Sequence, residues 1–262
     1  MLPFIITNES QHLVIGPHAL HEAGVRLGTI GGCKPRMWLA GQMPKVPLAT
    51  ELFDPIPRSE WPALIKAGAG TWLHDIAKPH LAPHDQAHTN FCWAHGPVRC
   101  FEVLRIARGF SPRRLSSASI AVPITGGRNI GGYPEKAMMQ LQSQGACSID
   151  LWPDTQLKKS PEALAFATEA KRNRLVKWID VQGFDMQMSC LLRRIPLVLP
   201  LNWWGHCVAG LDPYIDEKGE FGIGFDNSWG EDFGDYGYAY LDEEHGTAED
   251  GAYAPIEEGF SP

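Results

Sequence analysis

The order of its periodic patterns limits the fold of this chain more than any other feature. Helical spacing of apolar residues occurs in "CWAHGPVRCFEVLRIARG" (92–109), "YPEKAMMQLQSQG" (133–145) and "SPEALAFATEAKR" (160–172). β-type runs rich in aromatic and branched residues follow at 175–181, 195–204, 206–212, 221–227 and 236–242. Helices first and strands later predict an α+β protein with two lobes, a helical lobe of about 80–173 and a β lobe of about 174–241.

Local signals mark the ends of the three helices. The first begins at or beside Cys92, and Gly109 supplies its stop. Pro134 stands at the first helical position of the second, which Gly145 ends. Ser160 is a suitable cap for the third.

The two ends of the chain differ in amino-acid composition from the middle. Residues 1–55 are rich in Gly and Pro, with short β-prone runs "FIIT" (4–7) and "HLVIG" (12–16). Since they contain no long amphipathic helix, we expect this extension to dock, on the catalytic domain or on the sheet of a partner, rather than to inhibit. Residues 242–262 are acidic and predict a surface tail, which leaves 56–241 as the folded domain.

Composition excludes several classes of function. The net charge is −7 and no cluster of Lys and Arg could follow a phosphate backbone, so no nucleic acid partner is expected. No apolar run approaches the ~20 residues of a membrane span, and no secretion signal is visible. Six cysteines without CxxC pairing fit free thiols in a reducing compartment. We therefore expect a cytoplasmic or virion-associated protein.

Three residues in a fixed order suggest covalent chemistry. A nucleophilic cysteine needs a lowered thiol pKa, a base, and donors for the oxyanion of the substrate. Cys92 lies at a predicted helix N-terminus, where the helix dipole favours a thiolate. His206 follows 114 residues later at the start of a β run, and Asn227 follows 135 residues after Cys92.

Five motifs in this order resemble those of the papain-type cysteine proteases. A glutamine, Gln86, precedes the Cys92-Trp93 pair by six residues, as in that family. The loop "GGYP" (131–134), the run "WPD" (152–154), the histidine context "GHCVAGLDPY" (205–214) and the run "NSWGEDFGDYGYAYL" (227–241) are similar to family motifs. The resemblance covers about residues 55–241 and implies the papain-like fold, with a cleft between its lobes.

The resemblance implies a role for each matching residue. Cys92 would be a thiolate nucleophile paired with protonated His206, which donates its proton to the leaving amine. Asn227 would hold the imidazole, with Trp229 shielding that hydrogen bond. Gln86 and the backbone N–H of Cys92 would form the oxyanion hole, each member contributing roughly 3 kcal/mol. Neither a metal nor an organic cofactor is implied.

The substrate side of the cleft is also implied by the resemblance. Gly132 would pair its backbone with an extended peptide or protein substrate. Trp93 would support the nucleophile, and the remaining pocket residues would be Gly131, Tyr133, Pro134, Trp204 and Gly205. These walls predict an apolar or aromatic side chain at the second residue before the cleaved bond, and no basic preference.

The chain departs from the family at several positions. Thr89 and Asn129 stand where the family has a disulfide pair. Phe91 replaces a small residue before the nucleophile, and Pro97 removes a backbone donor inside the predicted helix.

A metal site is the main alternative interpretation of the histidines. His80, His84, His88 and Cys92 recur every four residues, but Pro79 and Pro83 interrupt a helix there. We therefore predict no metal, with His84, His88 and His95 at the surface or in loops. The run "GGRNIGG" lacks the Lys-Ser/Thr ending of a phosphate-binding loop.

Three functions remain after these exclusions. The first is a cysteine endopeptidase. The second is a structural or docking component of a larger assembly, such as a phage virion, that keeps the protease fold, since fold alone does not fix function. The third is another acyl transfer by the same Cys-His pair, such as transpeptidation or cell-wall amide cleavage.

Overall fold

The computed structural model describes residues 4–15, 32–36, 46–158 and 163–259. The helices of this part are α2 (Trp61–Ala67), α3 (Leu73–Ala77), α4 (Cys92–Ala107), α5 (Ala118–Thr125), α6 (Pro134–Ser143), α7 (Ala163–Ala170), α8 (Phe184–Leu192) and α9 (Glu243–Gly246). The strands are β1 (Ile5–Ile6), β2 (Arg174–Val181), β3 (Leu197–Leu201), β4 (His206–Ile215), β5 (Phe221–Asp226), β6 (Tyr238–Asp242) and β7 (Ala252–Gly259). Short 3₁₀ turns lie at Gln11–Leu13, Ala49–Glu51 and Arg58–Glu60.

The strands form one sheet in the order β1-β6-β5-β4-β3-β7-β2. Neighbouring strands are antiparallel, except that β1 runs parallel to β6. Antiparallel neighbours close in sequence, such as β4 and β5, need only the short turn at 216–220. Much of the β lobe therefore consists of strands that are neighbours both in the sequence and in the sheet.

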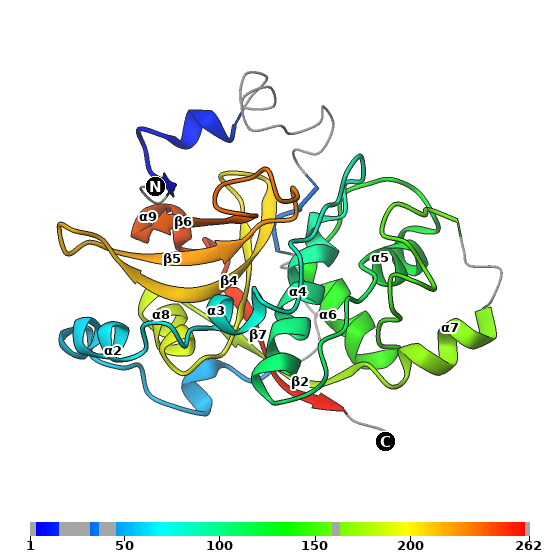
Figure 1. The fold of residues 1–262 in the computed structure, drawn as a ribbon, viewed down its shortest axis with the longest axis horizontal. Helices are drawn as coiled ribbons and strands as arrows, with labels where there is room; N and C mark the ends of the chain where they lie inside the picture. Colours follow the sequence, from blue (N-terminus) through cyan, green and yellow to red (C-terminus); the bar gives the residue numbers. More distant parts are fainter. Residues whose placement is uncertain (1–3, 16–31, 37–45, 159–162, 260–262) are drawn as a thin grey trace.

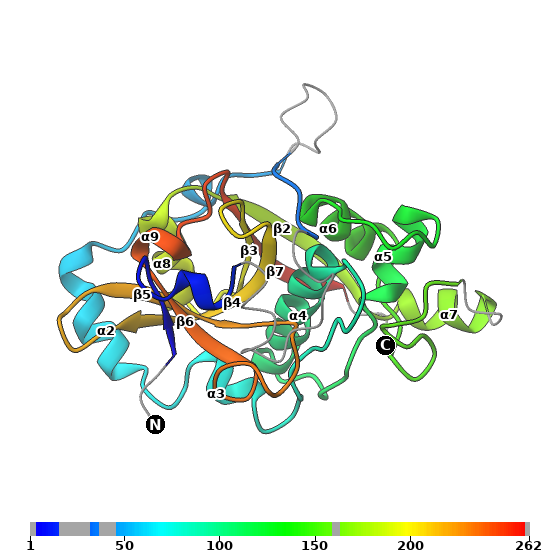
Figure 2. The same cartoon turned by 90° about the horizontal axis from the view of Figure 1, so that it is seen from above.

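Figure 1 shows the two lobes, with β5, β6 and α9 on the left, α5 and α7 on the right, and α4 between them. Each lobe has its own buried core. The helical core includes Trp93 and Phe101 of α4, and the β core includes Trp61 and Phe225. The view from above in Figure 2 separates the same two groups.

A glycine brings the central helix close to the sheet. A Cβ atom on Gly96 would lie 2.9 Å from Cys207 Sγ and 3.3 Å from the Val208 carbonyl oxygen. Only a residue without a side chain permits this approach of α4 to β4. The contact fixes the start of α4 against the start of β4, where the candidate catalytic residues lie.

The helix that begins at Cys92 was predicted correctly, and it continues through Pro97 to Ala107. Pro134 begins α6 as predicted. The five predicted strands from 175 to 242 are confirmed as β2 to β6. The third predicted helix is α7, and its predicted cap Ser160 lies outside the described residues. Short helices α2, α3, α5 and α8 were not predicted.

The acidic C-terminal tail predicted at 242–262 is wrong. Residues 252–259 form β7, which lies between β3 and β2 inside the sheet. Tyr253 pairs with both Val198 and Asp180 and is fully buried. The acidic residues around "AYAPI" concealed the strand, because its burial depends on neighbours more than 50 residues away in sequence.

The described parts of the N-terminal extension pack on the β lobe at several points, including a bridge between Leu48 and Asp180 of β2. Ile5 and Ile6 form β1, which adds a strand beside β6, so the "FIIT" run does join a sheet. The "HLVIG" run was predicted as a strand, and this is wrong for its first residues, because Gln11–Leu13 is a 3₁₀ turn. Val14 accepts a hydrogen bond of 3.0 Å from Trp204 Nε1. Among the described residues, no helix has the length and apolar character that crossing a bilayer requires.

Candidate active site

Cys92 is the first residue of α4 and is completely buried. The preceding loop is held by Asn129, whose Oδ1 accepts from the Asn90 backbone N at 2.7 Å and whose Nδ2 donates to the His88 carbonyl at 2.9 Å. These hydrogen bonds tie together the two loops that the family joins with a disulfide. Phe91 is buried and its ring lies 6.1 Å from that of Trp93, so its bulk belongs to the core.

His206 begins β4 and is oriented by Asn227. The distance between His206 Nε2 and Asn227 Oδ1 is 2.8 Å, and His206 Nδ1 has no partner. The imidazole lies between two indole rings, with centroid distances of 4.8 Å to Trp204 and 4.9 Å to Trp229. The hydrogen bond fixes the ring so that only Nδ1 remains for a reacting group.

The loop of Gln86 is joined to the loop of Asn227. Gln86 Oε1 accepts from Ser228 Oγ at 2.6 Å, and the Gln86 backbone N donates to the Ser228 carbonyl at 2.8 Å. Gln86 Nε2 donates to the Thr89 carbonyl at 2.8 Å. An amide nitrogen carries two hydrogens, so one remains for an oxyanion. The N–H of Cys92 is one of the first N–H groups of α4, which have no partner within the helix.

Residues 32–36 of the N-terminal extension lie beside these groups. The Gly132 N donates to the Gly32 carbonyl at 2.8 Å, and the Lys34 N donates to the Gly132 carbonyl at 2.9 Å, so Cys33 pairs with Gly132 as in a parallel bridge. The Cys33 N donates to the Gly205 carbonyl at 3.0 Å.

The segment also reaches the nucleophile. A Cβ atom on Gly32 would lie 2.8 Å from Cys92 Sγ, so this glycine packs directly on the thiol. The Cys33 thiol donates to the Lys34 carbonyl at 3.8 Å, and the nearby Cys207 thiol contributes to the raised pKa of Cys33. The Lys34 Nζ lies 5.4 Å from the centre of the Tyr133 ring. The segment therefore fills the space that the sequence assigns to substrate.

The structure brings the predicted residues to one place. Gly132, Tyr133 and Gly205 contact residues 32–36, and Pro134 begins α6 directly behind them. Trp93 lies under Gly132, where an added Cβ would come within 2.4 Å of the indole. The roles assigned to Gly131 and to the pocket as a whole stay predictions.

Burial changes the ionisation of the two reacting groups. Burial raises the pKa of the Cys92 thiol well above its usual value, and the nearby Cys33 adds to this effect. Burial lowers the pKa of His206 to about 4, although the Asn227 hydrogen bond acts in the opposite direction. Both groups are therefore neutral at pH 7 in this closed arrangement. The thiolate–imidazolium pair expected from the resemblance would need both groups exposed to water, and it stays a prediction.

The extension was expected to dock rather than to inhibit, and residues 32–36 dock on the catalytic domain at the candidate site itself, whereas inhibition is untested. They hydrogen bond to Gly132 and Gly205 and cover Cys92. The sequence signal was weak because the contact uses backbone atoms and a glycine, which carry no periodic pattern. Binding of a partner by other parts of the extension stays a prediction.

Two histidines expected at the surface are buried, His84 at 1% exposure and His95 at 0%. Their Nδ1 atoms are 3.0 Å apart, and His84 Nε2 lies 2.9 Å from Glu102. With Asp154 they form a group that could hold a metal ion. However, Arg114 already bonds to Asp154 at 2.9 Å and to Glu102 at 3.3 Å, so its charge opposes a cation here. We interpret the group as a structural polar network.

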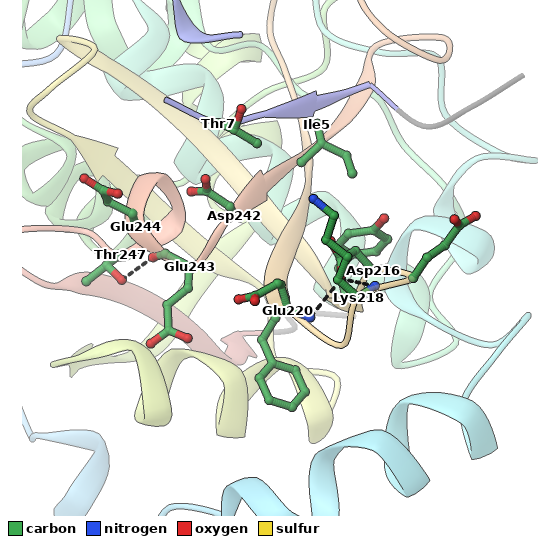
Figure 3. Close-up of a pocket in the computed structure, with 12 residues that line it drawn as sticks. Ile5, Thr7, Asp216, Lys218, Glu220, Asp242, Glu243, Glu244 and Thr247 are labelled. Atoms are coloured by element: carbon green, nitrogen blue, oxygen red, sulfur yellow. Dashed lines mark hydrogen bonds between the residues drawn. The ribbon is translucent and has the colours of Figure 1, made fainter. Parts of the chain in front are cut away.

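A separate hollow lies elsewhere, on the β lobe. It encloses about 1100 Å³ and contains none of the predicted catalytic residues (Figure 3). Six carboxylates contribute to its lining, namely Asp216, Glu217, Glu220, Asp242, Glu243 and Glu244.

Comparison with solved structures places the fold among the papain-like cysteine proteases, an α+β fold of two lobes. Xylellain, a cysteine protease from Xylella fastidiosa, matches with a TM-score of 0.64 and 19% identity over 90% of this chain and 98% of that chain. Procathepsin L2 from the larval midgut of Tenebrio molitor matches with a TM-score of 0.64 and 15% identity, over 97% of this chain and 84% of that chain. Bromelain from Ananas comosus, in complex with the E64 inhibitor, matches with a TM-score of 0.57 and 18% identity, over 71% of this chain and 98% of that chain.

Comparisons of sequence give no such relatives. No family model matches the chain, and no curated protein matches it significantly. At these low identities the structural likeness establishes the fold, while the chemistry depends on the residues of this chain.

Proposed function

We propose that the protein is a cysteine endopeptidase that uses Cys92, His206 and Asn227. The observation that carries this proposal is the orientation of His206. Its Nε2 is held by Asn227 Oδ1 at 2.8 Å, while its Nδ1 is unpartnered. A general base needs one nitrogen oriented and the other available to the nucleophile. The papain-like fold, shared with several proteases, supports the same reaction.

In the proposed reaction the Cys92 thiol gives its proton to His206 Nδ1, and Sγ attacks the carbonyl carbon of the substrate. The free amide hydrogen of Gln86 and the N–H of Cys92 donate to the oxyanion. His206 returns its proton to the leaving amine when the C–N bond breaks. Water then attacks the thioester, His206 accepts a proton from that water, and the thiol is regenerated with release of the acid.

The closed cleft makes the described state a latent one. Residues 32–36 must leave Cys92 before a peptide can pair with Gly132, because both use the same backbone atoms. Their departure admits water, which stabilises the charged forms of Cys92 and His206. A match that extends over 97% of this chain is a proenzyme, which is consistent with latency.

The test is covalent labelling of Cys92 by an epoxide inhibitor of papain-like enzymes, followed by peptide mapping. We expect one adduct on Cys92 and hydrolysis of a fluorogenic peptide, both lost in Cys92→Ala. Modification of the other cysteines alone, with turnover retained in Cys92→Ala, would refute the assignment. No observation favours the virion component or the transpeptidase alternative.

A further inference from the structure

The Arg36 side chain enters a pocket at one end of the covered cleft. Its Nη1 donates to Asp180 Oδ1 at 3.1 Å and to the Asp250 carbonyl at 2.9 Å, and its second terminal nitrogen also contacts Asp180. Its guanidinium lies 5.1 Å from the centre of the Tyr253 ring. The side chain is only 9% exposed, so the cation is enclosed by acidic and aromatic groups.

The acidic groups of this pocket belong to the body of the protein. Asp180 lies on β2, Asp250 precedes β7, and Glu135 lies on α6. Asp180 is 9% exposed and Glu135 is 1% exposed, and Glu135 accepts a bond of 3.3 Å from the Tyr253 hydroxyl. Buried carboxylates are costly unless a cation accompanies them. Asp180, which also accepts a hydrogen bond of 2.6 Å from Gln182, therefore favours a positive group in this pocket.

The pocket lies within reach of a substrate in the cleft. Arg36 is four residues from Gly32, which packs on Cys92 Sγ, and an extended chain spans at most about 14 Å over that distance. Between them, Lys34 bonds to Gly132, the residue expected to pair with substrate. Glu135 follows Tyr133 and Pro134 on the same turn. A side chain a few residues before the cleaved bond can reach this position.

We propose that Asp180, Asp250, Glu135 and Tyr253 form a substrate subsite for a basic side chain, which Arg36 occupies until residues 32–36 leave the cleft. This inference rests on the proposed peptidase function. It adds a basic preference at one position before the cleaved bond, and the apolar preference expected at the second residue before that bond stays a prediction. Arginine fits better than lysine, because its planar guanidinium can bond to Asp180 through two nitrogens and stack on Tyr253 at once.

The test uses the full-length protein and pairs of fluorogenic peptides. Arginine is placed in turn at each of the four positions before the cleaved bond, and each peptide is compared with one that carries citrulline, which has the same shape without the charge. Both members of a pair need the same open cleft, so the ratio of their kcat/KM values does not depend on the open fraction. We expect arginine to be favoured by about tenfold or more at one position.

Two variants test whether the preference for arginine arises from this pocket. Asp180→Asn should reduce the arginine to citrulline ratio several-fold, whereas the control Glu217→Gln, an exposed carboxylate in the turn before β5, should keep it. Equal rates for both peptides at every position in the unmodified protein would overturn the inference even if Asp180→Asn fails to fold. A preference unchanged in folded Asp180→Asn would also overturn it.

The two proposals fail differently. Cleavage and Cys92 labelling without any arginine preference would leave the peptidase function intact and remove only the basic subsite. Absence of both cleavage and Cys92 labelling, under conditions that displace residues 32–36, would remove the peptidase function and the subsite together.

Discussion

Replacement of Gly32 by alanine should open the cleft. The new Cβ would lie 2.7 Å from the Asn90 carbonyl oxygen and 2.8 Å from Cys92 Sγ, closer than real Cβ contacts allow. The Asn90 neighbour is a backbone atom, which cannot turn aside as a side chain can, and the Gly32 carbonyl is held by Gly132 at 2.8 Å. The backbone of Gly32 does not have the positive φ that strains alanine, so only the packing is affected. The easiest relief is departure of residues 32–36.

The size of the effect follows from two opposing terms. Overpacking of a close contact costs about 1–3 kcal/mol. Alanine also reduces the conformational freedom of the released segment, which opposes opening by roughly 0.4–1 kcal/mol. The central values of about 2 and about 0.7 kcal/mol leave about 1.3 kcal/mol, which corresponds to roughly a ninefold increase in the open fraction.

The assay is the rate at which iodoacetamide alkylates Cys92 at pH 7, measured by mass spectrometry of the Cys92 peptide. Gly246→Ala is the matched control, because its Cβ would meet Leu241 and Ile223 at ordinary distances of 3.4 and 3.5 Å. We expect faster alkylation in Gly32→Ala only. An unchanged rate in folded Gly32→Ala would show that these contacts do not limit access to the thiol.

Three further predictions concern stability and catalysis. Gln86→Ala should lower kcat about 10²–10³-fold because one oxyanion donor is lost, whereas an unchanged kcat would exclude that role. Arg99→Met should lower the free energy of unfolding by about 3–5 kcal/mol in urea titrations, because the buried Asp226 loses its guanidinium partner at 2.6 Å and keeps only His74 at 3.0 Å. The pKa of His206 is about 4 when folded and about 6.5 when unfolded, so the unfolded state binds more protons between these values. This histidine should therefore cost about 3 kcal/mol of stability as pH falls from 6.5 to 4, and constant stability over that range would contradict its burial.

The sequence predicted those parts of the fold that have a local pattern. The helix that begins at Cys92 and the strand that begins at His206 were both visible as periodic runs with suitable ends. The order and sequence context of Cys92, His206 and Asn227 resemble those of papain-type proteases, and this resemblance predicted that the three residues share one site. The structure joins His206 to Asn227 and packs the start of α4 on β4.

Tertiary structure alone decided the remaining features. The acidic surroundings of β7 gave no sign that Tyr253 would pair with Val198, 55 residues away. His84 became a buried residue only because His95 and Glu102 complete its hydrogen bonds.

The closed cleft is the clearest case of this limit. Gly32 reaches Cys92 through backbone contacts, and Arg36 finds a carboxylate on Asp180, which is 144 residues away in sequence. A local sequence pattern reports which face of a helix or strand is apolar. It carries no information on which distant backbone groups or charges will be left to pair, because that depends on how the finished lobes place them in space.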